Sequence, residues 1–253
     1  MISNKIYNTQ DLVLQISKSF DPAKLNLNEY KRFLNALCGN RDYQKAAIES
    51  AIIYLASGRY KSIEDLVYEN AKLNPHLISR YHTLEDYKRK LQFPQKLSAT
   101  IDLATGTGKS YVMYGIAQIA LSLGIVDKVL VLCPSLTIKD ELTKKFIECS
   151  ADKRLIEALP SSAHWRNPHI INANETIQSS FVCVTNIHAV YSSNSSSIVD
   201  SLGFNKGNSC LVLSDEVHHA YNKTEGRDEE TQSIKKWREL DRKSTRLNSS
   251  HRP

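Results

Sequence analysis

The chain has 253 residues and a formal net charge of +6, with 41% hydrophobic and 24% charged residues, which is ordinary for a globular protein. No apolar run reaches the roughly 18 residues that a membrane span needs, and polar residues interrupt the N-terminus at once. These features exclude a membrane-spanning class. The five cysteines form no CxxC pair, so we expect reduced thiols and a cytoplasmic protein.

The first part of the sequence predicts helices. Residues 1–40 carry spaced apolar positions and are interpreted as an N-terminal helical segment. "RDYQKAAIESAIIYLASG" predicts an amphipathic helix that stops at Gly58. Residues 59–95 then predict a small helical insertion, because Ser62 and Asp65 form a capping-box pattern and a second pattern runs from Thr83 to before Pro94.

From residue 99 onward, apolar strands alternate with helices. "ATIDLA", "KVLVLCP", "SFVCVTN" and "CLVLSDE" predict strands, and residues 109–123 and 137–150 predict helices between them. This alternation is typical of an α/β protein whose parallel sheet is covered on both faces.

The stretch "IDLATGTGKS" (101–110) predicts a phosphate-binding loop between a strand and a helix. Leu103 stands where the strict pattern has its first glycine, but the chemistry needs backbone N–H groups turned inward around phosphate oxygens. Lys109 would reach the β- and γ-phosphates and Ser110 would hold Mg²⁺. The candidate loop residues are Thr105, Gly106, Thr107, Gly108, Lys109 and Ser110.

A second chemical motif, "CLVLSDEVHHAY" (210–221), is an apolar strand that ends in two carboxylates. At the carboxyl edge of a parallel sheet, Asp215 would lie near the phosphate loop and hold Mg²⁺, while Glu216 would orient the attacking water. A zinc site that uses His218 and His219 is disfavoured, because adjacent histidines on one short turn point apart.

"ATGTGKS" together with "DEVH" resembles motifs I and II of the superfamily 2 helicases and translocases, most closely those related to the Res subunit of type III restriction systems. The resemblance covers about residues 40–225. It implies that Gln44 in "RDYQKAA" reads adenine and that His218 completes the DExH box. It also implies that nucleic-acid backbone is contacted by Pro134 and Ser135 after one strand, and by Thr185 and Asn186 after another.

The resemblance implies a RecA-like P-loop domain over residues 41–240, with ATP and Mg²⁺ as cofactors. The implied partner is nucleic acid, taken as double-stranded DNA, with a methyltransferase or specificity subunit. The family's coupling motif, second motor domain and arginine fingers have no counterpart here, so we expect an incomplete fold and an inactive fragment. The alternatives left open are a P-loop NTPase that does not act on nucleic acid and an inactive remnant.

The last thirteen residues, 241–253, have no apolar face and no periodicity. "DRKSTRLNSSH" matches, residue by residue, the translation of a widely used sequencing-library adapter. We therefore predict that this segment is an artefactual tail with no packed element. Without it, 29 basic and 26 acidic residues are left, a balance too mild to indicate nucleic-acid binding by itself.

Overall fold

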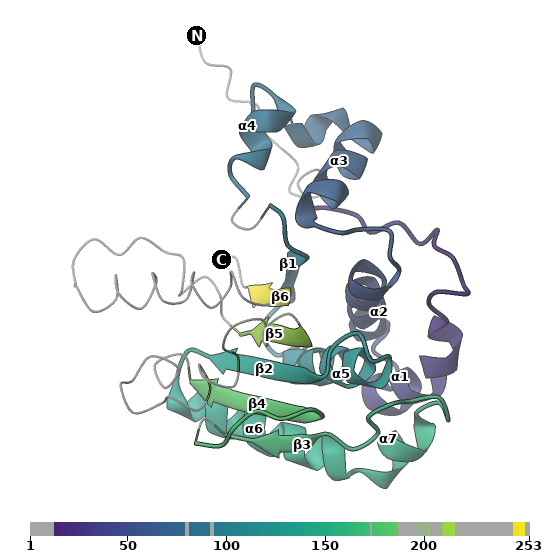
Figure 1. Ribbon diagram of the computed structural model, residues 1–253, viewed down its shortest axis with the longest axis vertical. Coiled ribbons are helices and arrows are strands. Elements are labelled where there is room, and N and C mark those ends of the chain that lie inside the picture. The colour runs from purple at the N-terminus through teal and green to yellow at the C-terminus, as the bar shows by residue number, and fades with distance from the viewer. Residues whose placement is uncertain are drawn as a thin grey trace, which may run out of the picture.

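The computed structural model describes residues 13–78, 81–91, 94–172, 174–186, 198, 202, 209–215 and 245–250. Its centre is a wholly parallel six-stranded sheet with the strand order β1-β6-β5-β2-β4-β3 (Figure 1). The strands are β1 (Ser98–Asp102), β2 (Lys128–Cys133), β3 (His169–Ile171), β4 (Phe181–Asn186), β5 (Cys210–Ser214) and β6 (Thr245–Ser250).

Helices precede the sheet and connect its strands. They are the 3₁₀ helices η2 (Leu27–Tyr30) and η3 (Pro75–Ile78), and the α-helices α1 (Lys31–Cys38), α2 (Asp42–Ala56), α3 (Ile63–Leu73), α4 (Leu84–Lys88), α5 (Lys109–Ser122), α6 (Leu136–Ala151) and α7 (Lys153–Ala158). The predicted α/β class is confirmed. Among the described helices, none combines the length and hydropathy that a membrane crossing requires.

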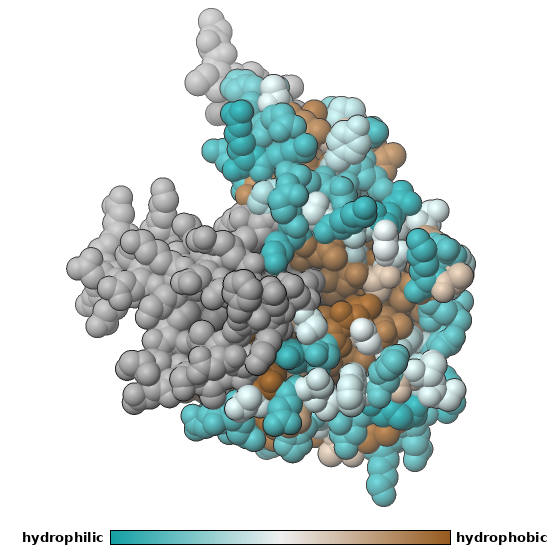
Figure 2. Space-filling view, viewed as in Figure 1, coloured by the Kyte–Doolittle hydropathy of each residue, from teal (hydrophilic) through white to brown (hydrophobic). Residues whose placement is uncertain are grey.

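The central strands are buried on both faces, as their continuous apolar runs predict. Every residue of β2 and β5 is buried. Alternate side chains of β2 enter different clusters, with Val129 and Val131 in the larger one beside α5 and α6, and Leu130 and Leu132 in the smaller one. Figure 2 shows hydrophobic residues gathered in the middle of the view, below the largely hydrophilic surface of the region that carries α3 and α4.

Helix α5 follows the phosphate loop and packs tightly against the helices that precede the sheet. An added Cβ at Gly115 would lie 2.6 Å from Ile48 Cδ1 in α2 and 2.9 Å from Leu37 Cδ2 in α1. Glycine at this position therefore lets α5 approach both helices closely. The consequence for the site is that α2 lies beside the start of α5, where the loop ends.

The prediction of a helical segment over residues 1–40 is correct only in part. Residues 1–12 lie outside the described residues, residues 13–26 form no helix, and helices begin at Leu27. Local side-chain bonds add to the difference, because Ser17 Oγ accepts from Ser19 N (3.2 Å) and Asp21 Oδ1 from Ala23 N (3.0 Å), while the backbone at Gln15 and Ser17 bonds to the insertion. Such bonds give the backbone an alternative to helix formation.

The predicted insertion, residues 59–95, contains α3, η3 and α4. The capping box of Ser62 and Asp65 is present at the start of α3. Thr83 Oγ1 caps α4, but that helix ends at Lys88, well short of the predicted end before Pro94. The segment leaves and rejoins the core at one place, since Ile63 N donates to Lys96 O at 2.8 Å.

Three further elements were not predicted from the sequence. Helix α7 and strand β3 are short, with six and three residues, and carry little periodic signal. The prediction that residues 241–253 hold no packed element is wrong, because Thr245–Ser250 pairs in parallel with β1 on one side and β5 on the other. Strand pairing uses backbone groups, so an apolar pattern is not required for it. The adapter origin of the segment stays a prediction.

Candidate nucleotide-binding site

The loop between β1 and α5 has the backbone of a phosphate cradle. Gly106 and Gly108 have φ angles of 76° and 75°, in the left-handed region that favours glycine. Thr107 Oγ1 donates to Ala104 O at 2.6 Å, which closes the turn. Gly108 is the N-cap of α5, so the positive end of this helix dipole is directed at the loop.

Leu103 replaces the expected first glycine without disturbing this arrangement. Its side chain is half-buried and packs against the main hydrophobic cluster. The left-handed conformations lie further along, at Gly106 and Gly108. The loop is therefore anchored at its start by an apolar side chain.

Helix α2 holds the loop from the side. Gln44 Nε2 donates to Thr107 O at 2.6 Å and to Gly108 O at 3.4 Å, and the Tyr43 hydroxyl donates to the same Thr107 carbonyl at 3.0 Å. The fit is close, because a Cβ on Gly108 would lie 2.6 Å from Gln44 Nε2. The sequence analysis did not identify Tyr43 as a site residue. The signal that could have found Tyr43 was its position next to Gln44.

Gln44 is fully buried, and its amide is only half satisfied. Its Oε1 has no hydrogen-bond partner among the described residues. A buried acceptor without a partner is costly and indicates that a donor belongs beside it. The exocyclic amino group of adenine is such a donor, so the residues present fit an adenine nucleotide.

Lys109 and Ser110 form the first turn of α5, and Asp215 directly follows β5. Asp215 N donates to Leu132 O at 2.9 Å, which extends the pairing of β5 with β2. Since β6 lies between β1 and β5, these two strands are two strand spacings apart, about 9.5 Å at about 4.8 Å each, and the loop and Asp215 follow their carboxyl ends on one edge of the sheet. Ser110 and Asp215 supply the oxygen atoms at this edge that would hold Mg²⁺.

Asp215 also affects a neighbouring thiol. Burial, which has the larger effect, and the negative charge of Asp215 raise the pKa of Cys133 to about 12. The positive charge of Lys139 acts in the opposite direction and lowers this pKa. Glu216 and His218, the other predicted catalytic residues, lie outside the described residues.

Cations surround the first aromatic residue of α5. The Arg41 guanidinium lies 5.8 Å and Lys145 Nζ 5.2 Å from the centroid of the Tyr111 ring. The Tyr111 ring in turn lies against the loop, 3.3 Å from the position of a Cβ on Gly108. Lys145 Nζ also pairs with Glu148 Oε2 at 2.9 Å, so Arg41 is the cation of the two that adds positive charge beside the loop.

The four predicted nucleic-acid contacts have different exposures. Pro134 and Ser135 are half-buried in the turn after β2, where Ser135 Oγ caps α6 by accepting from Ile138 N at 3.3 Å. Thr185 and Asn186 are buried in β4, at 1% and 5% exposure. Of these four residues, Pro134 and Ser135 are therefore the two with accessible surface at the edge.

Comparison with known proteins adds one match. Residues 37–248 match the model of a protein family described as type III restriction enzyme, res subunit. No curated protein matches the chain. The family match starts before α2, includes the loop and Asp215, and reaches into β6.

Proposed function

Since the chain belongs to the family of type III restriction enzyme res subunits, a family with a superfamily 2 helicase-like ATPase motor, we propose that it binds ATP with Mg²⁺ and uses it to act on DNA. The observation that carries the proposal is the loop at residues 103–110. It has two left-handed glycines, a helix N-terminus behind it, and Gln44 bonded to its backbone.

The roles of the chain's own residues follow from their chemistry. The loop amides and Lys109 bind the phosphates, because the N–H groups and the ammonium are donors to anionic oxygens. Ser110 and Asp215 would hold Mg²⁺, which would supply positive charge against the developing phosphate charge. Glu216 orients the attacking water, and His218 completes the motif in which both residues lie.

Recognition of the base rests on Gln44. Its Nε2 is committed to the loop carbonyls, so Oε1 is the atom left to accept from the adenine amino group. Guanine carries a carbonyl oxygen where adenine carries this amino group. That oxygen and Gln44 Oε1 are both acceptors, so they would not form a hydrogen bond. We therefore propose that the site prefers ATP to GTP.

Nucleic acid would lie along the carboxyl edge of the sheet, beside Pro134 and Ser135. Thr185 and Asn186 end the neighbouring strand, and their backbone belongs to the same edge. We propose double-stranded DNA as the nucleic acid, a methyltransferase or specificity subunit as protein partner, and the cytoplasm as location.

Nucleotide binding is tested by calorimetry with Mg-ATP on the 253-residue chain. Lys109→Ala should lower the affinity about ten- to hundredfold, since a charge-assisted hydrogen bond contributes roughly 1.5–3 kcal/mol. Lys153→Ala, an exposed change in α7, is the matched control and should bind as the unaltered chain does. Equal affinity of the Lys109 and Lys153 variants would refute the phosphate-loop assignment.

Action on nucleic acid is tested separately, by measuring phosphate release from Mg-ATP with and without duplex DNA. DNA should stimulate release, and Asp215→Asn should abolish it while ATP binding is largely retained. ATP hydrolysis that ignores DNA would favour the alternative, a P-loop NTPase that does not act on nucleic acid.

A further inference from the structure

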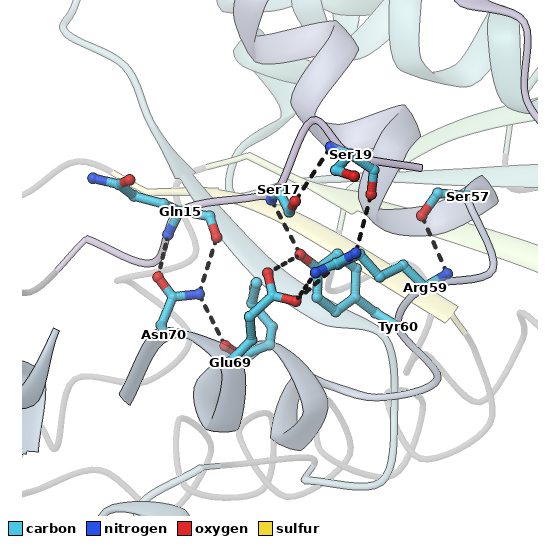
Figure 3. Close-up of polar contacts among 9 residues, drawn as sticks. Gln15, Ser17, Ser19, Ser57, Arg59, Tyr60, Glu69 and Asn70 are labelled. Atoms are coloured by element: carbon cyan, nitrogen blue, oxygen red, sulfur yellow. Dashed lines mark hydrogen bonds and ion pairs between the residues drawn. The ribbon is translucent and has the colours of Figure 1, made fainter. Parts of the chain in front are cut away.

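Residues 13–20, here called the strap, lie against the start of the predicted insertion, and main-chain groups make most of the polar contacts (Figure 3). Gln15 N donates to Asn70 Oδ1 at 2.7 Å, and Asn70 Nδ2 donates back to Gln15 O at 2.9 Å. Ser17 N donates to the Tyr60 hydroxyl at 3.1 Å. Arg59 Nη1 donates to Ser19 O at 3.0 Å. The contacts recur at every second residue, which is the period of an extended chain.

The side chains that bind the strap, those of Arg59, Tyr60 and Asn70, are themselves held in place by hydrogen bonds. Glu69 accepts from Arg59 Nε and from the Tyr60 hydroxyl, both at 2.8 Å. Asn70 Nδ2 also donates to Leu66 O within α3 at 2.9 Å. Tyr60 and Asn70 are only 4% and 6% exposed, so their polar atoms need partners. The surface is therefore preorganised for a peptide backbone.

The residues that alternate with Gln15 and Ser17 along the strap pack against the hydrophobic core. Leu14 and Ile16 are half-buried and pack against the main hydrophobic cluster. The same cluster includes Tyr54 of α2, whose ring centroid lies 5.6 Å from that of Tyr60 and whose hydroxyl donates to Ser98 O in β1. The strap thus joins the insertion to the elements that flank the phosphate loop.

We propose that Arg59, Tyr60 and Asn70 form a binding site for extended peptide main chain, occupied by the strap of this same chain, and that the occupied site clips the insertion to the core. The site binds main-chain atoms at Gln15, Ser17 and Ser19, so its contacts with the strap do not depend on the side chains at these positions. It opens locally without unfolding the sheet, since the strap is only partly buried. The proposal is independent of ATP binding.

The test compares proline with alanine on the strap of the full chain. Gln15→Pro combined with Ser17→Pro removes the two N–H donors, whereas Gln15→Ala combined with Ser17→Ala keeps them. Lys18→Pro is the matched control, because the Lys18 N–H donates no hydrogen bond to any of the described residues. Hydrogen exchange and limited proteolysis of residues 13–20 report opening of the strap.

The proline pair should raise the opening constant by about two- to tenfold for each bond lost. Lys18→Pro should leave it close to the original value, and the alanine pair should raise it less than the proline pair, since both pairs lose the bond from Ser19 N to Ser17 Oγ and only the proline pair also loses the two N–H donors. Tyr60→Phe, which removes one acceptor on the other side of the contact, should open the strap to a smaller extent. The melting temperature shows whether the fold persists in each variant.

Two results would overturn the proposal. One is equal release by the alanine and proline pairs, which would mean that side chains hold the strap. The other is equal protection in the proline pair and in Lys18→Pro, which would mean that the apolar contacts alone hold it.

Discussion

Gly106 and Gly108 share one backbone conformation and differ in their surroundings. Nothing lies within 4 Å of a Cβ added at Gly106, whereas a Cβ at Gly108 would meet Gln44 and Tyr111. Gly108 is therefore required twice, for its φ angle and for the approach of α2. Gly106 is required for its φ angle and leaves open space of the kind that a phosphate group would fill.

This difference predicts unequal effects of the same substitution. Gly106→Ala and Gly108→Ala each incur the left-handed cost of about 1–2 kcal/mol. Gly108→Ala adds overpacking against Gln44, by about 1–3 kcal/mol. Urea unfolding should show the larger loss for Gly108→Ala, and equal losses would contradict the close packing of α2 on the loop.

At the scale of elements, the strands bury thiols. Cys133, Cys183 and Cys210 lie in β2, β4 and β5, and burial raises the pKa of each to about 12 from 9.0. A thiol whose pKa is raised by folding favours the folded state fully below pH 9. That contribution is lost as the pH rises from 9 toward 12, because the unfolded chain ionises first.

We therefore expect the urea concentration at the unfolding midpoint to stay constant around neutral pH and to fall above about pH 9. Burial also raises the pKa of Tyr54 and Tyr114, which adds to the fall in the same direction. Cys183→Ala isolates one thiol, since its midpoint should decline less steeply above pH 9 than that of the unaltered chain. An identical slope in both proteins would mean that burial does not raise the pKa of Cys183.

Prediction from sequence succeeded where one local signal decided the structure. Gly58 and Gly124 end helices as expected, with φ angles of 69° and 67°, and the apolar runs of β2 and β5 are buried strands. It failed over residues 13–26, where the backbone bonds to the insertion, and at β6, where neighbouring strands supply the partners. Both depend on contacts between residues far apart in sequence.

The candidate site divides in the same way. The glycine pattern was enough to predict the phosphate loop, whereas Gln44 was suggested by the resemblance of "RDYQKAA" to a family motif. The bond of Gln44 to Thr107 O could not be predicted, because it depends on how α2 rotates against α5. The burial of Thr185 likewise follows from its central strand, which a motif comparison does not contain.

At the scale of the whole molecule, β6 joins the two parts of the sheet. It pairs with β1 over five positions and with β5 over four. Through these pairings it fixes the spacing between the phosphate loop, which follows β1, and Asp215, which follows β5. The segment taken from sequence for a tail thus lies between the two halves of the candidate site.

Deleting residues 241–253 should therefore lower the free energy of unfolding by several kcal/mol, since each ladder hydrogen bond contributes about 0.5–1.5 kcal/mol. Deleting residues 251–253 alone leaves β6 intact and is the control. Urea unfolding of both deletions gives the comparison. Unchanged stability in the longer deletion would contradict the pairing of β6 and support the original prediction of an unpacked tail.

The position of β6 also bears on the order in which the sheet assembles. Ser98 and its partner Arg246 are 148 positions apart, whereas Val129 and Val182 are 53 apart and His169 and Phe181 are 12 apart. Closing the longer loop costs more chain entropy and contributes more to contact order, so we expect β3, β4, β2 and β5 to associate before β1 joins them. A nucleotide that contacts both Lys109 and Asp215 would bind only after that closure, and by mass action it would draw the late-joining strand into place.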